Sequence, residues 1–440
     1  MSVFQDLVSQ EAAKSEILRA AAAARLLRAG EVSAAINTAN PDNSGISPVI
    51  GAGTSANANT ADGTKTYISH AAELNTSAMT HAWLFTGPPG SGRSLAARAF
   101  AACLQCEEEH LGGGECSECK AVMADNHPDV DVVTTDLVTI SVEQVRQLVA
   151  RSYLAPSSGA WRVFIIEDAD RIIARTTNVL LKAIEEPAPR TIWILCTTAV
   201  ADVLPTIRSR CRNINLVTPD PAAVAELLVR RDGVDLETAK VAALASQSHI
   251  GVARALAHDT EARILRNRSL DVFLSIRGVG DAVIAAKALV DANYMLGREA
   301  QSSKKKSTDT EEAAEAARIK KMEALGLDPN AKIPTGLRGQ INEDADNEKR
   351  RQTRRNLDRL DRELIYLVSF FRDVLVRQLG AEVDLVNLDY ESQINRWASS
   401  LPVSASLEAL DQLSLARTRL QQNVTPALVF EAALVGLPLP

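Results

Sequence analysis

Between residues 80 and 220 the chain alternates short apolar runs with longer segments whose apolar residues recur at helical spacing. An unbroken run of about four or five apolar residues is typical of a parallel strand that is covered on both faces. Patterns of this kind predict strands at residues 83–85, 130–133, 163–166, 192–195 and 213–217. Strands that alternate with helices in this way indicate an α/β domain with a parallel sheet.

Helical periodicity predicts the elements on either side of these strands. A helix is expected over residues 3–30, after a short extended entry at Val3 and Phe4, and three short helices over residues 218–258 suit a small lid domain. From residue 259 to residue 440 the pattern is helical, which predicts a third, all-helical domain. The expected organisation is therefore an α/β domain over residues 1–217, followed by the lid and the C-terminal helical domain.

Two polar segments interrupt this order. Residues 35–75 consist mainly of Asn, Ala, Gly, Ser and Thr, and residues 300–350 carry basic and acidic residues in near balance. Such segments bury too little apolar surface to offset the entropy lost on ordering, so we expect two flexible insertions. The locally basic stretch 349–362 is either a charged helix face or a contact for DNA or a partner protein.

Candidate chemistry begins at the glycine-rich stretch Gly87-Pro-Pro-Gly-Ser-Gly-Arg-Ser94, which lies between the first predicted strand and a helix. Strand, glycine-rich loop and helix in this order can cradle a phosphate, because backbone N–H groups and the helix N-terminus face the same anion. The stretch fits the pattern G-x-x-x-x-G-K-[ST] except that Arg93 replaces lysine. The alternative interpretation is a plain strand–turn–helix connection.

Acidic residues follow the third predicted strand. Glu167 and Asp168 come directly after the apolar run of residues 163–166. In a P-loop nucleotidase, the end of such a strand carries the carboxylate that holds Mg²⁺ and the carboxylate that activates water. The usual order of aspartate and then glutamate is reversed here.

Four of the six cysteines form two C-x-x-C pairs, Cys103 with Cys106 and Cys116 with Cys119. Paired thiolates hold zinc tetrahedrally, and the spacer contains three consecutive glycines that would let the pairs approach each other. We therefore predict a structural zinc site in a module over residues 103–119. The alternative is a set of thiols that bind nothing.

Composition narrows the class of protein further. Apolar residues make up 46% of the chain and charged residues 23%, which is ordinary for a globular protein. The net charge of −7 argues against binding DNA through bulk positive charge. The N-terminal residues do not read as a secretory signal, and no apolar run is long enough to span a membrane. A cytoplasmic protein without membrane contacts is expected.

Several of these motifs together resemble one known family. The loop GPPGSGRS, the stretches VFIIEDADRI and NVLLKAIEEP, and Ser209-Arg-Cys211 are similar to the clamp-loader branch of the AAA+ P-loop family. Within that branch, the altered phosphate loop and the intact Ser-Arg-Cys are most similar to the delta-prime subunits of bacterial DNA polymerase III. The resemblance covers about residues 1–260 and implies an AAA+ domain, a lid and a ring-forming helical collar.

The resemblance also implies a role for each matching residue. Glu167 falls on the metal position and Asp168 on the catalytic-base position. Arg210 falls on the arginine finger that reaches a neighbouring subunit's ATP. The residues that fall on nucleotide-binding positions, including the first sensor and the second sensor, are Gly87, Gly90, Gly92, Arg93, Ser94, Thr198 and Arg254.

The implied function is a subunit of the DNA polymerase III clamp loader that helps to load the sliding clamp in an ATP-dependent way and has little or no ATPase activity of its own. The subunit would belong to the holoenzyme, which is a DNA-directed DNA polymerase, a nucleotidyltransferase of the replisome at the nucleoid. Its partners would be gamma/tau and delta subunits in a hetero-pentamer, a sliding clamp and primed DNA, and any ATP with Mg²⁺ in this chain is doubtful. Two alternatives remain. One is a gamma/tau-like ATPase motor, and the other is a zinc-bearing scaffold without nucleotide.

Overall fold

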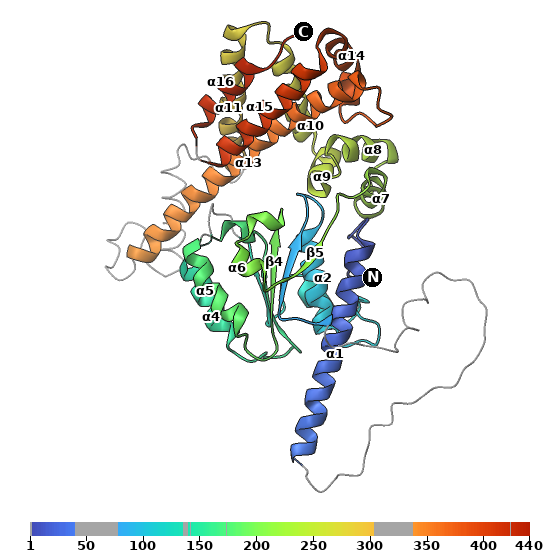
Figure 1. Cartoon of the computed structure of the whole chain (residues 1–440), viewed down its shortest axis with the longest axis vertical. Coiled ribbons are helices and arrows are strands. Elements are labelled where there is room, and N and C mark those ends of the chain that lie inside the picture. Colours follow the sequence, from blue (N-terminus) through green and yellow to red (C-terminus); the bar gives the residue numbers. More distant parts are fainter. Residues whose placement is uncertain are drawn as a thin grey trace, which may run out of the picture. The chain divides into compact units, whose positions relative to one another are not determined.

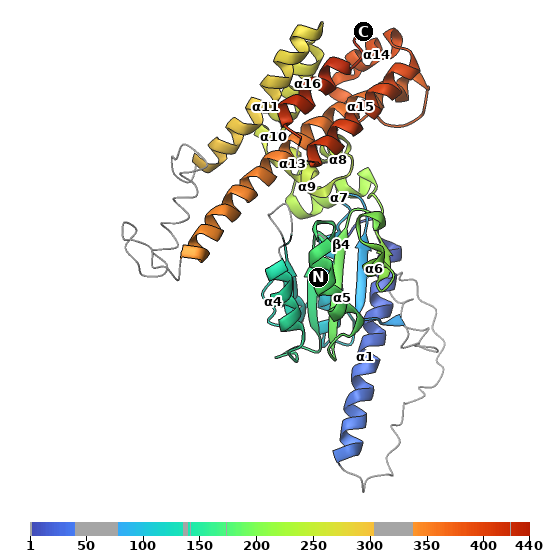
Figure 2. The same cartoon turned by 60° about the vertical axis from the view of Figure 1, so that its left-hand side comes forward.

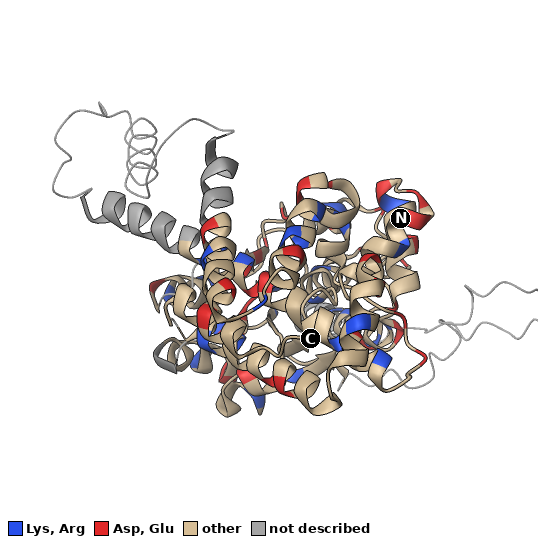
Figure 3. Ribbon diagram, turned by 90° about the horizontal axis from the view of Figure 1, so that it is seen from above, with Lys and Arg blue, Asp and Glu red and all other residues tan. Residues whose placement is uncertain are grey.

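A computed structural model describes residues 2–39, 78–134, 140, 142–172, 174–302, 338–422 and 424–440. These residues form two compact units, of which the first ends at Val217 and the second runs from Thr218 to Pro440. No helix among the described residues is both long enough and apolar enough to cross a membrane. Basic and acidic residues are interspersed along the described helices (Figure 3).

The first unit contains a five-stranded parallel sheet in the order β2-β3-β4-β1-β5. Its strands are β1 (Ala82–Thr86), β2 (Val130–Val133), β3 (Arg162–Ile166), β4 (Thr191–Thr197) and β5 (Arg212–Asn215). Every residue of β1, β3 and β4 is buried, as expected for central parallel strands that are covered on both faces. All five predicted strands and the α/β class are confirmed.

Helices cover both faces of this sheet, with α1 and α2 on one side and α4 and α5 on the other (Figures 1 and 2). Trp83 and Phe85 on β1 pack against Phe100 on α2, with ring centroids 5.0 and 6.2 Å apart. The helices of this unit are α1 (Glu11–Ala39), α2 (Arg93–Gln105), α3 (Ser117–Met123), α4 (Val142–Ser152), α5 (Ala174–Glu185) and α6 (Pro205–Arg208), with 3-10 turns η3 (Ala169–Arg171) and η4 (Val200–Asp202).

The predicted start of the first helix is wrong. The helix begins at Glu11 and not at residue 3, because Ser9 adopts a φ of 58°, which an α-helix does not allow. Val3, Phe4 and Leu7 are nevertheless buried, in a turn-rich segment that joins the core beneath α2.

The two predicted insertions lie mostly outside the described residues. The helix α1 continues to Ala39, so the first five residues of the predicted insertion 35–75 are helical. Residues 40–77 and 303–337 are not described. The second predicted insertion is likewise flanked by helices, since α11 ends at Ser302 and α13 begins at Arg338.

In the second unit, every regular element among the described residues is a helix. Three of these helices have an aspartate as their N-cap. The carboxylates of Asp220, Asp235 and Asp259 accept hydrogen bonds from backbone N–H groups in the first turn at 2.8–2.9 Å. The helices are α7 (Pro221–Asp232), α8 (Leu236–Ala245), α9 (Ile250–His258), α10 (Thr260–Leu274), α11 (Val279–Ser302), α13 (Arg338–Gln378), α14 (Glu391–Ser400), α15 (Val403–Gln421) and α16 (Pro426–Gly436), with the 3-10 turn η5 (Leu388–Tyr390).

An aromatic cluster forms the centre of the C-terminal helices. Phe273, Phe370, Phe371 and Trp397 lie with ring centroids 5.3–5.9 Å apart, mostly edge to face. Such pairs contribute about 0.5–1.5 kcal/mol each beyond the burial of their area. The cluster confirms that the sequence after the α/β unit builds an all-helical core. The boundary between lid and collar stays a prediction, because both belong to one compact unit.

Candidate nucleotide and metal sites

The glycine-rich stretch forms a loop between the end of β1 and the start of α2. Gly92 precedes α2 with a φ of 92°, a conformation that glycine adopts without steric cost. A side chain at Gly87 would lie 2.6 Å from the Leu216 carbonyl oxygen, so only glycine fits there. The Gly87 N–H donates to the carbonyl oxygen of Thr198 at 3.3 Å, which places the end of β4 beside the loop.

Arg93 contacts its own loop. One terminal nitrogen of its guanidinium donates to the Gly87 carbonyl oxygen at 2.9 Å. A lysine at this position of a phosphate loop would reach the β- and γ-phosphates as a compact point charge. In the described structure the arginine instead closes the loop from residue 87 to residue 93, and phosphate would have to compete with that bond.

Gln10 supports the loop from the N-terminal segment, and it was not predicted from the sequence. Its buried amide donates to the Ser91 carbonyl oxygen at 3.4 Å and to the Val217 carbonyl oxygen at 2.7 Å, and it accepts from the Val217 N–H at 3.0 Å. The side chain therefore ties the phosphate loop to the end of the first unit. No motif marks a single glutamine whose partner lies 207 residues away.

Both acidic residues after β3 have arginine partners within the chain. Glu167 forms an ion pair with Arg98 of α2, and Arg98 also contacts Asp125 at 2.7 Å. Burial acts to lower the pKa of Arg98, but its bonds to Asp125 and the charge of Glu167 outweigh burial and raise the pKa. Asp168 pairs with Arg171 at 3.2 Å. The predicted metal and base positions are thus already neutralised, and Arg98 is a site residue that the sequence analysis missed.

Thr198 lies at the edge of the same site. Its hydroxyl donates to the Asp202 carboxylate at 2.7 Å, so Asp202 orients the side chain at the predicted sensor position. Arg254, the predicted second sensor, belongs to the other unit. It lies on α9 and pairs with Asp232 at 3.2 Å, with 61% of its side chain exposed.

Arg210 lies on the short connection between α6 and β5. Its guanidinium pairs with Glu185 at the end of α5 at 2.7 Å and donates to the Thr206 carbonyl oxygen at 2.7 Å. The side chains of Arg210 and Glu185 are 40% and 44% exposed. An ion pair this exposed contributes little to stability, so the arginine is accessible to a partner at small cost.

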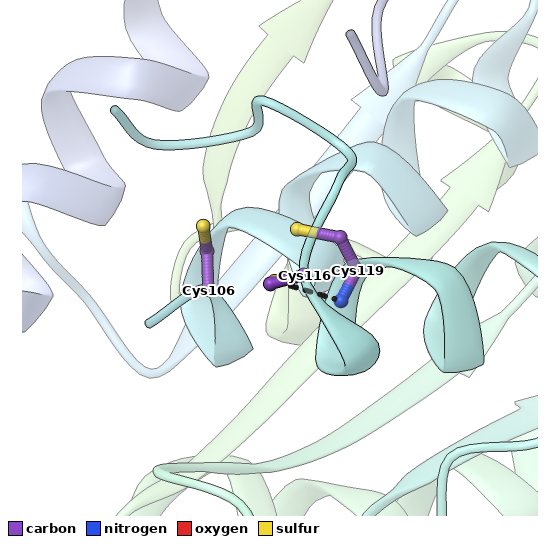
Figure 4. A group of neighbouring side chains, drawn as sticks. All are labelled: Cys106, Cys116 and Cys119. Carbon is purple, nitrogen blue, oxygen red and sulfur yellow. Dashed lines mark hydrogen bonds between the residues drawn. The ribbon is translucent and has the colours of Figure 1, made fainter. Parts of the chain in front are cut away.

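Three of the four predicted zinc ligands lie together. The sulfurs of Cys106, Cys116 and Cys119 are all within 4.8 Å of one another. Cys106 follows the last residue of α2, and the other two cysteines flank the start of α3 (Figure 4). The Cys119 N–H donates to the Cys116 sulfur at 3.3 Å, and such bonds outweigh burial and lower the pKa of the Cys116 thiol. A lowered pKa favours the thiolate that binds metal.

Cys103 does not join this group in the described structure. Its sulfur lies beneath Gly112, where an added side chain would approach it to 2.8 Å and would also meet Val3 and Phe4. Burial in these surroundings raises the pKa of the Cys103 thiol well above its usual range. The predicted set of four ligands is therefore reduced to three neighbouring sulfurs, because the fourth packs in the core.

The sheet, the glycine-rich loop and the acidic strand end define an AAA+ type P-loop domain whose phosphate loop carries arginine. Two family models match the chain: "DNA polymerase III, delta subunit" over residues 64–220 and "DNA polymerase III, delta subunit, C terminal" over residues 351–437. Together they cover more than half of the chain, which belongs to the family of DNA polymerase III clamp-loader subunits. The resemblance inferred from the sequence is confirmed.

Individual relatives include more than one kind of subunit. The chain is 36% identical to the delta-prime subunit of Pseudomonas aeruginosa over 154 residues, which are 34% of this chain and 47% of that protein. It is 34% identical to the gamma/tau subunit of Mycobacterium tuberculosis over 172 residues, or 38% of this chain and 30% of that protein. It is 24% identical to the tau subunit of Bacillus subtilis over 367 residues, or 82% of this chain and 57% of that protein.

These matches span about a third to somewhat over half of the length of the relatives. Among solved structures, a gamma subunit-related protein of Thermotoga maritima covers 78% of this chain and 96% of its own, at 15% identity and a TM-score of 0.27. A score this low adds no argument about the fold.

Proposed function

We propose that this chain acts as a delta-prime-type subunit of a clamp loader. In this role it joins gamma/tau and delta subunits in a hetero-pentamer that uses ATP to load a sliding clamp onto primed DNA. The observation that carries the proposal is the bond from Arg93 to the Gly87 carbonyl oxygen, which occupies the phosphate loop with the chain's own side chain. The proposal assigns little or no ATP hydrolysis to this chain.

The acidic residues support the same assignment. Glu167 would have to leave Arg98, and Asp168 would have to leave Arg171, before either carboxylate could hold Mg²⁺ or align a water molecule. Catalysis of phosphoryl transfer depends on positioning within hydrogen-bond distance, and Asp168 is one methylene shorter than the usual glutamate. Gly87, Gly90 and Gly92 have positive φ angles, which supports a glycine-dependent loop, and we assign nucleotide binding without turnover to it.

Arg210 is the group we assign to catalysis in a neighbouring subunit. A guanidinium offers two parallel donors to a γ-phosphate and stabilises the charge that develops as the phosphoryl group leaves. Arg210 is exposed, and its guanidinium contacts Glu185, the Thr206 carbonyl oxygen and, at 3.3 Å, the Ser209 hydroxyl. If the guanidinium of Arg210 moved from Glu185 to the phosphate of a neighbouring subunit, it would exchange one anionic partner for another.

A structural zinc ion is the proposed occupant of the cysteine group. Cys106, Cys116 and Cys119 supply three thiolates, and a tetrahedral structural site needs a fourth ligand. Cys103 remains the proposed fourth ligand, and its sulfur would have to leave its place beneath Gly112. Zinc would hold the end of α2 to the start of α3.

The deciding experiment measures nucleotide binding and turnover by the purified chain, alone and with gamma/tau and delta subunits. We expect no appreciable turnover by the chain alone and clamp loading by the complete assembly. Arg93→Lys is the matched variant, because it restores the usual residue but leaves Glu167 and Asp168 paired. Robust turnover that is lost in Asp168→Asn would instead establish the gamma/tau-like motor. If the chain neither binds nucleotide nor assembles with the gamma/tau and delta subunits, only the interpretation as a zinc-bearing scaffold would remain.

A further inference from the structure

The second unit contains a cavity of about 300 Å³ that no motif of the sequence marks. Helices α8, α9 and α10 line it, together with Asp389 of η5. One wall is apolar and consists of Val241, Ala242, Ala245 and Leu256. The volume is at the lower end of the range found for small-molecule sites. The cavity is thus large enough for a compact ligand with a short apolar body.

The lining also includes a buried cation. Arg266 is only 4% exposed, and its terminal nitrogens donate to Asn387 at 2.6 Å and to Asn267 at 3.3 Å. Its buried Nε has no hydrogen-bond partner among the described residues. A guanidinium carries five N–H donors, and an unsatisfied donor of a buried charge is costly. Arg266 therefore has unused capacity to donate to an anion.

The charges around the cavity favour a ligand with a single negative charge. Asp389 pairs with Arg266 at 3.8 Å, but its side chain is 59% exposed and compensates the buried charge poorly. Glu237 is already paired with Lys240 at 3.0 Å, while Arg263 adds a second positive charge to the lining. Burial lowers the pKa of Arg266, although the charge of Asp389 acts to raise it.

We propose that this cavity binds a carboxylate attached to a short branched aliphatic body, with the carboxylate at Arg266 and the aliphatic part against Val241 and Leu256. Multiply charged phosphates are disfavoured by the carboxylate of Asp389 at the lining. The same chemistry is offered by a free small carboxylate and by the C-terminal leucine of a peptide. The proposal does not depend on nucleotide binding or on Arg210.

The test uses the full chain with isotope-labelled valine and leucine methyl groups, observed by NMR. Isovalerate is the probe, its neutral amide isovaleramide is the comparator, and a pentapeptide ending in leucine is compared with its C-terminal amide. We expect saturable shifts of the Val241 and Leu256 methyl signals with isovalerate. The amide should bind at least about tenfold more weakly, because it lacks the charge-assisted hydrogen bond.

Val241→Glu places a negative charge at the rim of the cavity, where the wild-type side chain is 45% exposed and the change is compatible with folding. This variant should lose binding of isovalerate. The matched control is Val229→Glu on α7, a residue that is 37% exposed and does not line the cavity, and it should bind normally.

Tighter binding of the leucine peptide than of isovalerate would identify a protein chain end as the source of the ligand. Binding of isovalerate alone would identify a free small molecule. Equal binding of acid and amide, unchanged binding by Val241→Glu, or no saturable shift would overturn the proposal.

Discussion

Replacing Arg210 with alanine separates a trans-acting arginine from an ordinary surface residue. Within the chain, the replacement removes the ion pair with Glu185 and the contact with the Thr206 carbonyl oxygen. Because the two charged side chains are 40% and 44% exposed, we expect a loss of at most about 1 kcal/mol of unfolding free energy. The variant should therefore fold and enter the assembly normally.

The effect on catalysis should be much larger than the effect on stability. An arginine finger contributes on the order of 10³- to 10⁵-fold in rate at the site that it completes. A loader with several ATP sites retains the turnover of the others, so the readout is the single site next to this chain, measured in single-turnover hydrolysis. Arg210→Lys should recover only part of the rate, because lysine lacks the planar pair of donors.

Arg208 provides the matched control, since it is an exposed arginine two residues earlier on α6. Arg208→Ala should assemble, hydrolyse ATP and load clamps at the wild-type rate. Assembly is scored by size-exclusion chromatography, separately from DNA-stimulated hydrolysis and clamp loading. Wild-type rates in an intact assembly that carries Arg210→Ala would refute the trans-acting role.

Three further predictions concern the first unit. Metal analysis of protein purified without chelator should find about one zinc ion per chain, and Cys119→Ser should lose this zinc. Less than about half an equivalent of zinc in the wild-type protein would contradict the proposed zinc site. Gln10→Ala should cost about 1–2 kcal/mol of unfolding free energy, because it removes both hydrogen bonds to the half-exposed Val217 backbone. An effect below about 0.5 kcal/mol in urea unfolding would contradict this bridge. Burial acts to raise the pKa of the Asp129 carboxyl, but hydrogen bonds from the backbone N–H groups of Ser157, Ser158 and Gly159 lower it below its value in the unfolded chain. The stabilising contribution of Asp129 should therefore be lost as the pH falls below about 4. Wild type should lose stability on acidification more steeply than Asp129→Asn.

The sheet could be predicted from the sequence because its strands are unbroken apolar runs that the fold buries on both faces. The strand β3 shows this most clearly, since all five of its residues are buried. The start of α1 could not be predicted in the same way. The sequence predicts Val3 and Phe4 as a short extended entry to the helix, but they are buried in a turn-rich segment, and Ser9 with its positive φ precedes the helix. The pattern of apolar residues therefore predicts which residues are buried better than it predicts the backbone conformation.

The candidate site was predictable only as far as its local motifs reach. The glycine loop and the acidic pair are local, and the structure brings both to the C-terminal edge of the sheet. The bonds that decide their chemistry are long-range, such as the pair between Arg98 and Glu167, which are 69 residues apart. The cysteine spacing likewise identified the right region but not the packing of Cys103 beneath Gly112.

The arginine contacts satisfy polar groups of the candidate nucleotide site with side chains of the chain itself. Glu167 has only 18% of its side chain exposed, and an unpaired carboxylate at that depth would destabilise the domain. Arg98 supplies within the chain the positive charge that a metal ion would otherwise bring, and Arg93 satisfies the Gly87 carbonyl oxygen. We therefore expect the first unit to be stable without bound ATP. Arg98→Met should accordingly destabilise the isolated chain. Adding Mg²⁺ with ATP should restore its stability only if Glu167 still acts as a metal ligand. Thermal unfolding of the variant with and without Mg-ATP would decide whether it does.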